Sequence, residues 1–336
     1  MFAGFEALTG LVLAVSGGPD SLALVRLAAH WRDLGVTVPL HVATVDHGLR
    51  ADSAAEAEQV GRWARALGLP HEILVWRGEK PLSGVQERAR DARYALLFQH
   101  ARTVGADAVA TAHHADDQWE TILIRLAHGT GLAGLAGMAR DQSFHGGRLL
   151  RPLLSLPKQA LIEFCRRERQ DFFSDPANSN QAFERARWRA AAPALRALGL
   201  TARRLAKLAE RASKANAALD AMALDLLQRT KMPEGGVDKY NLQEMGDAPQ
   251  AALERYLAMA VARVAGAPPP RLERLELFAQ KLRVALDRRA TFRATIGGCA
   301  ARLDRASILT LRLEELRRRG RPRTAEAKEL TELPMD

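Results

Sequence analysis

Short apolar runs alternate with longer, helix-like segments over the first 127 residues of the chain. Four of the runs have the length and composition of β-strands: residues 11–15, 40–45, 73–76 and 108–112. The segments after them predict helices, at 20–34, 51–67 and 85–104, with a fourth that follows 113–117 and extends to about 127. Strands separated by helices in this way form βαβ units. The pattern therefore predicts an α/β fold, with a parallel sheet that has helices on both faces.

The ends of these strands indicate where a ligand would bind. In open parallel sheets, ligands bind beyond the carboxyl ends of the strands. Three strand exits are rich in glycine or polar residues, at 16–21, 46–50 and 113–117. We expect the three exits to converge on one crevice.

The first exit reads Ser16-Gly17-Gly18-Pro19-Asp20-Ser21. The two glycines let the backbone approach an anion closely, and the proline suits the first position of a helix. The N-terminus of that helix would direct free N–H groups at a phosphate. Ser21 can donate a hydroxyl, and Asp20 can orient a metal or a nucleophile. A plain tight turn explains two glycines alone, but the six residues together favour a phosphate site.

Two common phosphate-binding motifs do not fit this loop. A Walker loop ends in Gly-Lys-Ser/Thr, and the first lysine of the chain is Lys80. The dinucleotide-binding fingerprint needs a third glycine, which the loop lacks.

The third exit begins a segment that reads His-His-Ala-Asp-Asp-Gln-Trp-Glu over 113–120. Asp116 and Glu120 are spaced i, i+4 and so share one helix face, where like charges repel by about 0.2–0.5 kcal/mol. A cation such as Mg²⁺ or a substrate ammonium would relieve this repulsion. Acids that simply cap the helix are the alternative. The histidine pair lacks further zinc ligands at suitable spacing, which argues against a metal hydrolase.

The net charge of +10 and the pI of about 10.2 come mostly from arginine, since only eight of the 49 basic residues are lysine. Such a chain favours a phosphate-rich partner, above all nucleic acid, although a GC-rich genome also raises arginine content. Aromatic residues make up 5%, which argues against a base-stacking surface.

The two cysteines, Cys165 and Cys299, are too far apart for a C-x-x-C site and too few for a disulfide framework. No apolar run approaches the roughly 20 residues of a membrane span, and the first ten residues lack the basic start of a secretory signal. We therefore expect a cytoplasmic protein.

The second half of the chain has a different pattern. Residues 190–227 are rich in Ala, Leu and Arg with helical periodicity, and 291–313 predicts a β-hairpin around Gly297-Gly298. We expect two domains, an α/β domain at 1–195 and a smaller, mainly helical domain at 196–336.

The phosphate loop resembles that of the N-type ATP pyrophosphatases, whose pattern is Ser-Gly-Gly-x-Asp-Ser. This resemblance implies the PP-loop, or adenine nucleotide alpha hydrolase-like, fold. It also implies enzymes that release pyrophosphate from ATP and adenylate a carbonyl-type oxygen. A leaving pyrophosphate on a helix N-terminus is reasonable because negative charge accumulates there in the transition state.

Taken together, the motifs resemble those of the tRNA(Ile)-lysidine synthases over roughly residues 11–195. The matching segments are Ser16–Ser21, Val45–Arg50, Ala89-Arg90 with Arg93-Tyr94, 113–118 with Glu120-Thr121, the glycine-rich 129–138, and Arg151–Leu154. A further segment matches in part: Asp175-Pro176-Ala177-Asn178, then Phe183, Arg185, Arg187, Arg189 and Pro193. This segment departs from the family pattern at Ala177, Asn180 and Ala186.

The resemblance implies a reaction in two steps. ATP adenylates O2 of the wobble cytidine, position 34, in a tRNA(Ile) with a CAU anticodon. The ε-amine of free L-lysine then attacks C2 and displaces AMP, which gives lysidine. ATP, Mg²⁺, lysine and this tRNA are the implied ligands, and a homodimer is the assembly we consider.

The resemblance also implies a role for each group of residues. Phosphate binding falls to Ser16, Gly17, Gly18, Pro19, Asp20 and Ser21, and the adenine lies against Val45, Asp46, His47 and Gly48. The catalytic acids are Asp20, Asp116, Asp117 and Glu120, with Asp20 and Asp116 as candidate Mg²⁺ ligands and the general base left open. Substrate binding falls to Arg90, Arg93, His113, Asn178, Arg185, Arg187 and Arg189. Residues after 196 grip tRNA outside the anticodon, with a basic helix that carries Arg203, Arg204, Lys207, Arg211 and Lys214.

Other readings of the motifs remain open. An ordinary turn explains 46–50, and a solvated charged face explains Arg90 and Arg93. The alternative functions are a PP-loop tRNA thiolase, a small-molecule amidating enzyme, and a non-catalytic RNA-binding protein with a nucleotide-binding fold. A thiolase of this kind needs an accessible, reactive cysteine.

Overall fold

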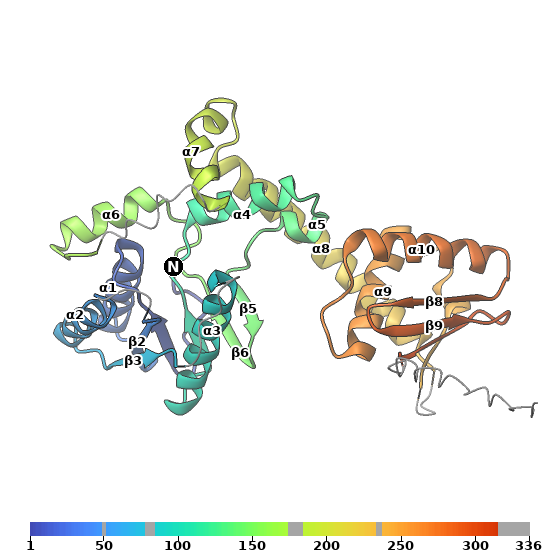
Figure 1. The fold of residues 1–336 in the computed structure, drawn as a ribbon, viewed down its shortest axis with the longest axis horizontal. Helices are drawn as coiled ribbons and strands as arrows, with labels where there is room; N and C mark the ends of the chain where they lie inside the picture. The colour runs from blue at the N-terminus through green and yellow to red at the C-terminus, as the bar shows by residue number, and fades with distance from the viewer. Residues whose placement is uncertain (49–51, 78–84, 174–183, 233–236, 315–336) are drawn as a thin grey trace, which may run out of the picture. The chain divides into compact units, whose positions relative to one another are not determined.

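The computed structural model describes residues 1–48, 52–77, 85–173, 184–232 and 237–314. Contacts divide the chain into two units, Met1–Asn216 and Ala217–Asp336 (Figure 1). The division falls within the long helix α8 (Ala202–Thr230), later than the 195/196 boundary expected from the sequence. That domain boundary stays a prediction.

The first unit is built on a six-stranded sheet in the order β3-β2-β1-β4-β6-β5. Its strands are β1 (Leu11–Ala14), β2 (Leu40–Asp46), β3 (His71–Val75), β4 (Ala108–Ala110), β5 (Asp141–Phe144) and β6 (Gly147–Leu150). Neighbouring strands from β3 to β6 are parallel, and only β5 runs antiparallel to its neighbour. The predicted α/β class is confirmed, with an antiparallel edge strand that the sequence analysis did not anticipate.

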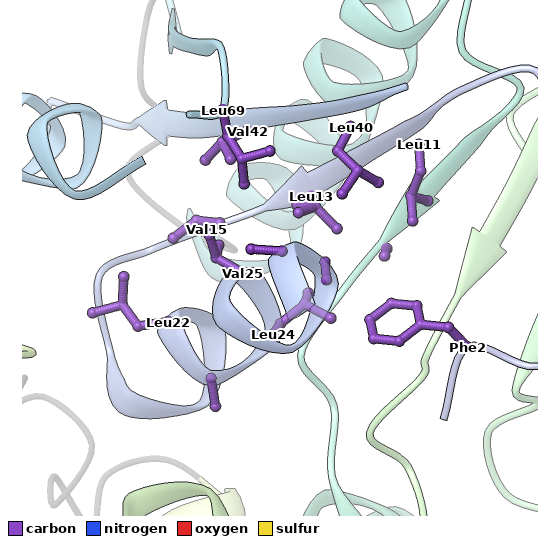
Figure 2. Packing of buried hydrophobic residues seen from close by; sticks show 14 of the residues in the cluster. Phe2, Leu11, Leu13, Val15, Leu22, Leu24, Val25, Leu40, Val42 and Leu69 are labelled. Carbon is purple, nitrogen blue, oxygen red and sulfur yellow. The ribbon is translucent and has the colours of Figure 1, made fainter. Parts of the chain in front are cut away.

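The position of β1 at the centre of the sheet explains why its sequence is continuously apolar. The strand pairs with β2 on one side and β4 on the other, so that Leu11 is in register with both Leu40 and Ala108. Alternate side chains of a strand face opposite sides of the sheet. Leu11 and Leu13 join the core between the sheet and α1 (Pro19–Asp33), as Figure 2 shows, whereas Val12 joins a separate core on the other face. Both faces of β1 are therefore buried.

Helices cover both faces, as predicted. One core contains residues of α1 (Pro19–Asp33), α2 (Ser53–Ala66) and α6 (Lys158–Arg167), and the other contains residues of α3 (Val85–Thr103). The remaining helices of the unit are α4 (Ala115–Ala127), α5 (Leu132–Leu135), α7 (Glu184–Ala197) and the first part of α8. Trp119 of α4 lies in a third core with residues of α7 and α8, and its indole N–H donates to the Leu200 carbonyl at 2.5 Å.

The strand order reverses at β1, the strand that leads into the loop at 16–21. The chain moves outward from β1 to β2 and β3, then returns to the opposite side of β1 with β4. Ligands of open α/β sheets bind at such a reversal, beyond the carboxyl ends of the two strands. The loops that leave β1 and β4 carry 16–21 and 113–117, which are two of the three predicted exits.

The second unit contains more sheet than the sequence analysis expected. Strands β7 (Asp238–Asn241), β8 (Phe292–Ile296), β9 (Cys299–Leu303) and β10 (Ile308–Leu313) form an antiparallel sheet in the order β7-β10-β9-β8. Helices α9 (Gln250–Ala265) and α10 (Leu272–Asp287) share a core with this sheet, and the short 3₁₀ helix η2 (Leu242–Met245) follows β7. The predicted hairpin is present as β8 and β9, joined by two left-handed glycines, but it is one part of a four-stranded sheet.

Within the described residues, none of the helices is long and apolar enough to cross a membrane.

Candidate active site

One serine, Ser21, fixes the conformation of the loop after β1 through two hydrogen bonds. The Ser21 hydroxyl donates to the Gly18 carbonyl at 2.9 Å and accepts from the Ser16 N–H at 3.3 Å. Gly18 is the N-cap of α1 and has no side chain to bond the first N–H groups of the helix. A Cβ at Gly18 would meet no atom of the described residues within 4 Å. The first turn of α1 is therefore open to an anion.

Gly17 is required by both its conformation and its surroundings. Its φ is +83°, in the left-handed region, and its carbonyl accepts from the Phe173 N–H at 2.9 Å. A Cβ at Gly17 would lie 2.6 Å from Phe173 Cδ2 and 3.2 Å from Val60 Cγ2. The two glycines thus have different roles. Gly17 lets the loop pack closely against Phe173 and Val60, and Gly18 leaves space at the N-terminus of α1.

Asp20 presents an unsatisfied oxygen beside this loop. Its Oδ2 lies 3.6 Å from His114 Nε2 and 3.8 Å from Lys158 Nζ. Its Oδ1 is buried and has no hydrogen-bond partner among the residues that the structure describes. Buried carboxylate oxygens are normally paired, so this atom indicates a missing ligand. Mg²⁺ fits, because it commonly binds proteins through one or two carboxylates and takes its other ligands from phosphates and water.

His114 connects the acidic segment to the phosphate loop. It caps α4, where its Nδ1 accepts from the Asp117 N–H at 3.4 Å and Asp117 Oδ2 accepts from the His114 N–H at 3.0 Å. Burial lowers the pKa of His114, but a hydrogen bond with Asp20 and the charges of Asp117, Asp20 and Asp116 outweigh it and raise the pKa overall. The histidine therefore holds three carboxylates around one ring.

The other two positions of the acidic face already have cationic partners. Arg196 donates to Asp116 Oδ1 at 2.7 Å, and the Lys158 backbone N–H donates to Asp116 Oδ2 at 2.8 Å. Glu120 is buried, and Arg189 bonds both of its oxygens, at 2.5 and 3.2 Å. The predicted repulsion on this face is thus relieved by arginines. The described residues contain no cluster of three or more His, Cys, Asp or Glu that could enclose a metal.

His113 lies near basic side chains, whereas its neighbour His114 lies near acidic ones. The Nδ1 of His113 lies 2.8 Å from the Thr111 hydroxyl. Burial and the charges of four arginines, Arg151, Arg93, Arg90 and Arg185, lower its pKa to about 3. A neutral imidazole is therefore surrounded by cations, and the site has an acidic part around His114 and a basic part around His113.

Comparison with known proteins identifies the family. The family model of the PP-loop domain matches residues 4–194. The tRNA(Ile)-lysidine synthase of Methylobacterium nodulans is 48% identical over 94% of this chain and 94% of the relative. That of Rhodopseudomonas palustris is 45% identical over 88% of this chain and 86% of the relative. The chain belongs to the tRNA(Ile)-lysidine synthase family. A PP-loop domain implies ATP binding, which agrees with the open loop at Gly18.

A solved structure agrees with this fold. The U34-tRNA thiolase NcsA from Methanococcus maripaludis aligns with a TM-score of 0.52 over 60% of this chain and 72% of the thiolase. Its sequence identity is 13%, so the likeness concerns the fold alone.

The structure brings together most of the residues expected from the sequence. Asp20, Asp116 and Asp117 meet around His114, and Arg90, Arg93 and Arg185 lie near enough to His113 to shift its pKa. The segment Val45–Gly48 comprises the last two residues of β2, the neighbour of β1, and the two residues after it, and the Gly48 N–H donates to Asp46 Oδ1 at 2.8 Å. The predicted ligand Asn178 lies outside the described residues. All of these functional roles stay predictions.

Some residues of the site have no signal in the local sequence. Lys158, Arg196 and Phe173 approach the phosphate loop or the acidic segment from positions at least 40 residues away. Arg151 is also buried, with 4% of its surface exposed, and it donates to the Ala139 carbonyl at 2.7 Å. Its buried Nε has no hydrogen-bond partner in the part of the chain that the structure describes. A buried cation without a carboxylate partner indicates a site for an anion.

Proposed function

We propose that this chain uses ATP to attach free lysine to the wobble cytidine, position 34, of a CAU-anticodon tRNA(Ile). In the first step, O2 of the cytidine attacks the α-phosphate of ATP and releases pyrophosphate. In the second, the lysine ε-amine attacks C2 and displaces AMP. The observation that carries this proposal is the 48% identity, over nearly the whole length of both chains, to a relative named tRNA(Ile)-lysidine synthase.

The open end of α1 supports a role in binding the pyrophosphate part of ATP. Gly18 leaves space for phosphate oxygens, and the N–H groups of the first turn direct positive potential at them. Lys158, whose side chain is 43% exposed beside Asp20, is close enough to add a positive charge. We assign Mg²⁺ to Asp20 Oδ1, where the bound ion would neutralise the charge of the leaving pyrophosphate.

The acidic segment supports a site for lysine. An ammonium group needs carboxylates that are not already neutralised. Arg196 and Arg189 bond Asp116 and Glu120 closely. Asp117 is less fully neutralised, because its Oδ2 accepts from the His114 N–H while its Oδ1 has only a longer contact, 3.8 Å, with Arg189. We therefore assign the ε-ammonium of lysine to Asp117, which would orient the amine after it loses a proton. Asp116 and Glu120 would then serve mainly to hold α4 against α6 and α7.

The basic part of the site supports binding of the nucleotide. Arg90, Arg93, Arg151 and Arg185 act together on His113, so their positive potentials overlap at that point. Guanidinium groups bind phosphates in a bidentate manner, and the neutral His113 adds no further charge. We assign this region to the tRNA nucleotide that receives AMP.

The thiolase alternative receives no support from the two cysteines. Cys165 and Cys299 are both buried, and burial raises the pKa of Cys165 to about 11. A sulfur carrier must be accessible and reactive as a thiolate. Neither thiol meets that condition.

The nucleosides that the enzyme produces would test the proposal. The protein would be incubated with ATP, Mg²⁺, lysine and a CAU-anticodon tRNA(Ile) transcript, and the digested tRNA analysed by mass spectrometry. We expect cytidine with one attached lysine, and none from a matched transcript in which uridine replaces the wobble cytidine. A thiolated nucleoside, or unmodified cytidine from a folded enzyme, would contradict the proposal.

A further inference from the structure

The antiparallel sheet of the second unit has one buried face and one exposed face. Alternate residues of its strands pack in the core with α9 and α10; examples are Leu303 of β9 and Leu309 and Leu311 of β10. The residues between them point away from that core. Four of these outward residues are exposed and basic: Lys239, Arg293, Arg302 and Arg312.

The strand register lines up most of these cations. Arg293 on β8 lies directly opposite Arg302 on β9, and Arg302 lies opposite Thr310 on β10. Thr310 in turn lies opposite Lys239 on β7. One row therefore crosses all four strands and reads Arg, Arg, Thr, Lys. With about 4.8 Å between neighbouring strands, the row spans roughly 14 Å. Arg312 lies two residues beyond Thr310 on the same face.

Folding does not explain this row. Like charges directly opposite each other on a sheet are destabilising, as Arg293 and Arg302 are here. Over the described residues, none of the four cations forms an ion pair. Nearby acids are used elsewhere, since Asp238 pairs with Arg263 at 3.2 Å and Asp304 Oδ1 accepts from the Ile308 N–H at 2.9 Å. Glu314, which follows β10, is exposed. The face thus keeps a concentrated positive charge.

We propose that this exposed sheet face, formed by Lys239, Arg293, Arg302, Thr310 and Arg312, binds the phosphate backbone of the tRNA substrate. Arginine pairs with phosphate in a bidentate manner, and a threonine hydroxyl adds a further donor. The outward positions carry no aromatic side chain for stacking, so the face suits the backbone and not the bases. A nucleic-acid strand carries one phosphate per nucleotide, so a row of roughly 14 Å is long enough to contact more than one phosphate. The inference rests on the proposed function, because it takes tRNA as the substrate.

The basic helix α8, which we expected to contact tRNA, is less available for phosphate binding than the sheet face. On α8, Lys207 and Lys214 both pair with Glu210, at 2.8 and 2.7 Å. Part of its positive charge is therefore neutralised within the helix, which favours the sheet face as the stronger phosphate contact.

Salt dependence of tRNA binding would test the inference in the full-length protein. Each phosphate contact contributes about 0.7–0.9 to the slope of log K against log salt concentration. For the triple variant Arg293→Gln, Arg302→Gln, Arg312→Gln we expect that slope to become shallower by about two and the affinity at low salt to fall at least tenfold. The single Arg302→Gln variant is expected to lower the slope by about one.

The matched control removes the same charge from another surface of the same unit. Arg274, Lys281 and Arg288 are exposed on or next to α10, and changing all three to Gln is expected to keep the wild-type slope and an affinity within twofold. Thermal melting would confirm that every variant folds. A wild-type slope in the sheet variant, or an equal loss in both triple variants, would overturn the inference. Lost binding to anionic vesicles with unchanged tRNA binding would also overturn it and assign the face to a membrane.

Failure of the proposed function would be visible separately. A wild-type protein that neither binds tRNA nor transfers lysine contradicts the proposed function itself. A wild-type protein that does both, beside a sheet variant with unchanged tRNA binding, contradicts only the role of the sheet face.

Discussion

His113 is held neutral by burial and by four surrounding arginines, with a pKa of about 3 against 6.5 in the unfolded chain. Because the folded pKa is the lower one, the unfolded state takes up a proton first as the pH falls. His113 therefore contributes its full stability above pH 6.5 and loses it, by up to about 1.4 kcal/mol per pH unit, as the pH falls from 6.5 toward 3.

Urea unfolding of the wild type and of His113→Gln would measure this effect. We expect the difference between their free energies of unfolding to shrink by about 1 kcal/mol between pH 7 and pH 5.5. The raised pKa of His114 acts in the opposite direction, but His114 is present in both proteins and cancels in the difference. A difference that does not change with pH would show that His113 is not held neutral.

Glu120 and Arg189 form an ion pair in which the carboxylate is buried. Arg189→Met would leave that buried charge without its partner, which we expect to lower the free energy of unfolding by about 2–3 kcal/mol. Adding Glu120→Leu should recover most of the loss, since the unpaired charge is then removed. Arg196→Met, which breaks a more exposed pair with Asp116, is the control and should cost under about 1 kcal/mol. Additive effects of the two Arg189 and Glu120 changes would contradict the pairing.

The ion pairs of the site also show where reasoning from the sequence stops. The i, i+4 spacing correctly places Asp116 and Glu120 at the start of one helix. It does not reveal that Arg189 and Arg196, some 70 to 80 residues later, neutralise them. Local spacing predicts a charge that needs a partner, but only the tertiary fold selects the partner.

The loop between β1 and α1 gives a contrast between neighbouring glycines. Gly17→Ala combines a left-handed φ of +83° with a close approach to Phe173, so we expect it to destabilise the protein by about 1–3 kcal/mol. Gly18→Ala has an extended backbone and open space, so it should fold normally and weaken ATP binding instead. Thermal melting and ATP titration of both variants would check this. Wild-type ATP affinity in Gly18→Ala would argue against phosphate at this position.

The sequence predicted some strands of the two units and missed others. Strands β1, β2 and β4 were confirmed because buried parallel strands are largely apolar, as in Leu11–Ala14. The edge strand β3 has no fully buried residue and was predicted from its apolar run 73–75. Strands β5 and β6 were not predicted, since β5 is the polar, largely exposed edge segment Asp141–Phe144. In the second unit, β7 consists of Asp-Lys-Tyr-Asn, which has no strand pattern of its own and is a strand only through pairing with β10. Short edge strands depend on their neighbours more than on their composition.

At the scale of the whole molecule, replacing the cysteines would distinguish lysine transfer from thiolation. Cys165 and Cys299 are buried, so the double variant to Ala removes both thiols without exposing a new surface. We expect lysine transfer close to the wild-type rate, with a loss of about 1–2 kcal/mol in stability from the small cavities. Abolished activity in a folded double variant would favour sulfur chemistry.

Several expectations at this scale stay predictions. They are the homodimer, the cytoplasmic location, and the division of catalytic and tRNA-binding roles near residue 195. The contacts divide the chain at 216/217, inside α8, so a helix that begins in one unit continues into the other.

The central claim is that the phosphate loop and Asp20 serve lysine transfer to tRNA. The most direct measurement is the rate of transfer of labelled lysine to a CAU-anticodon tRNA(Ile) in the presence of ATP and Mg²⁺. Three proteins would be compared: the wild type, Asp20→Ala, and Asp33→Ala, which removes an exposed acid from the other end of the same helix. We predict label in the tRNA with the wild type and Asp33→Ala, and at least a hundredfold slower transfer with a folded Asp20→Ala. No transfer by the wild type, or equal transfer by all three, would contradict the account.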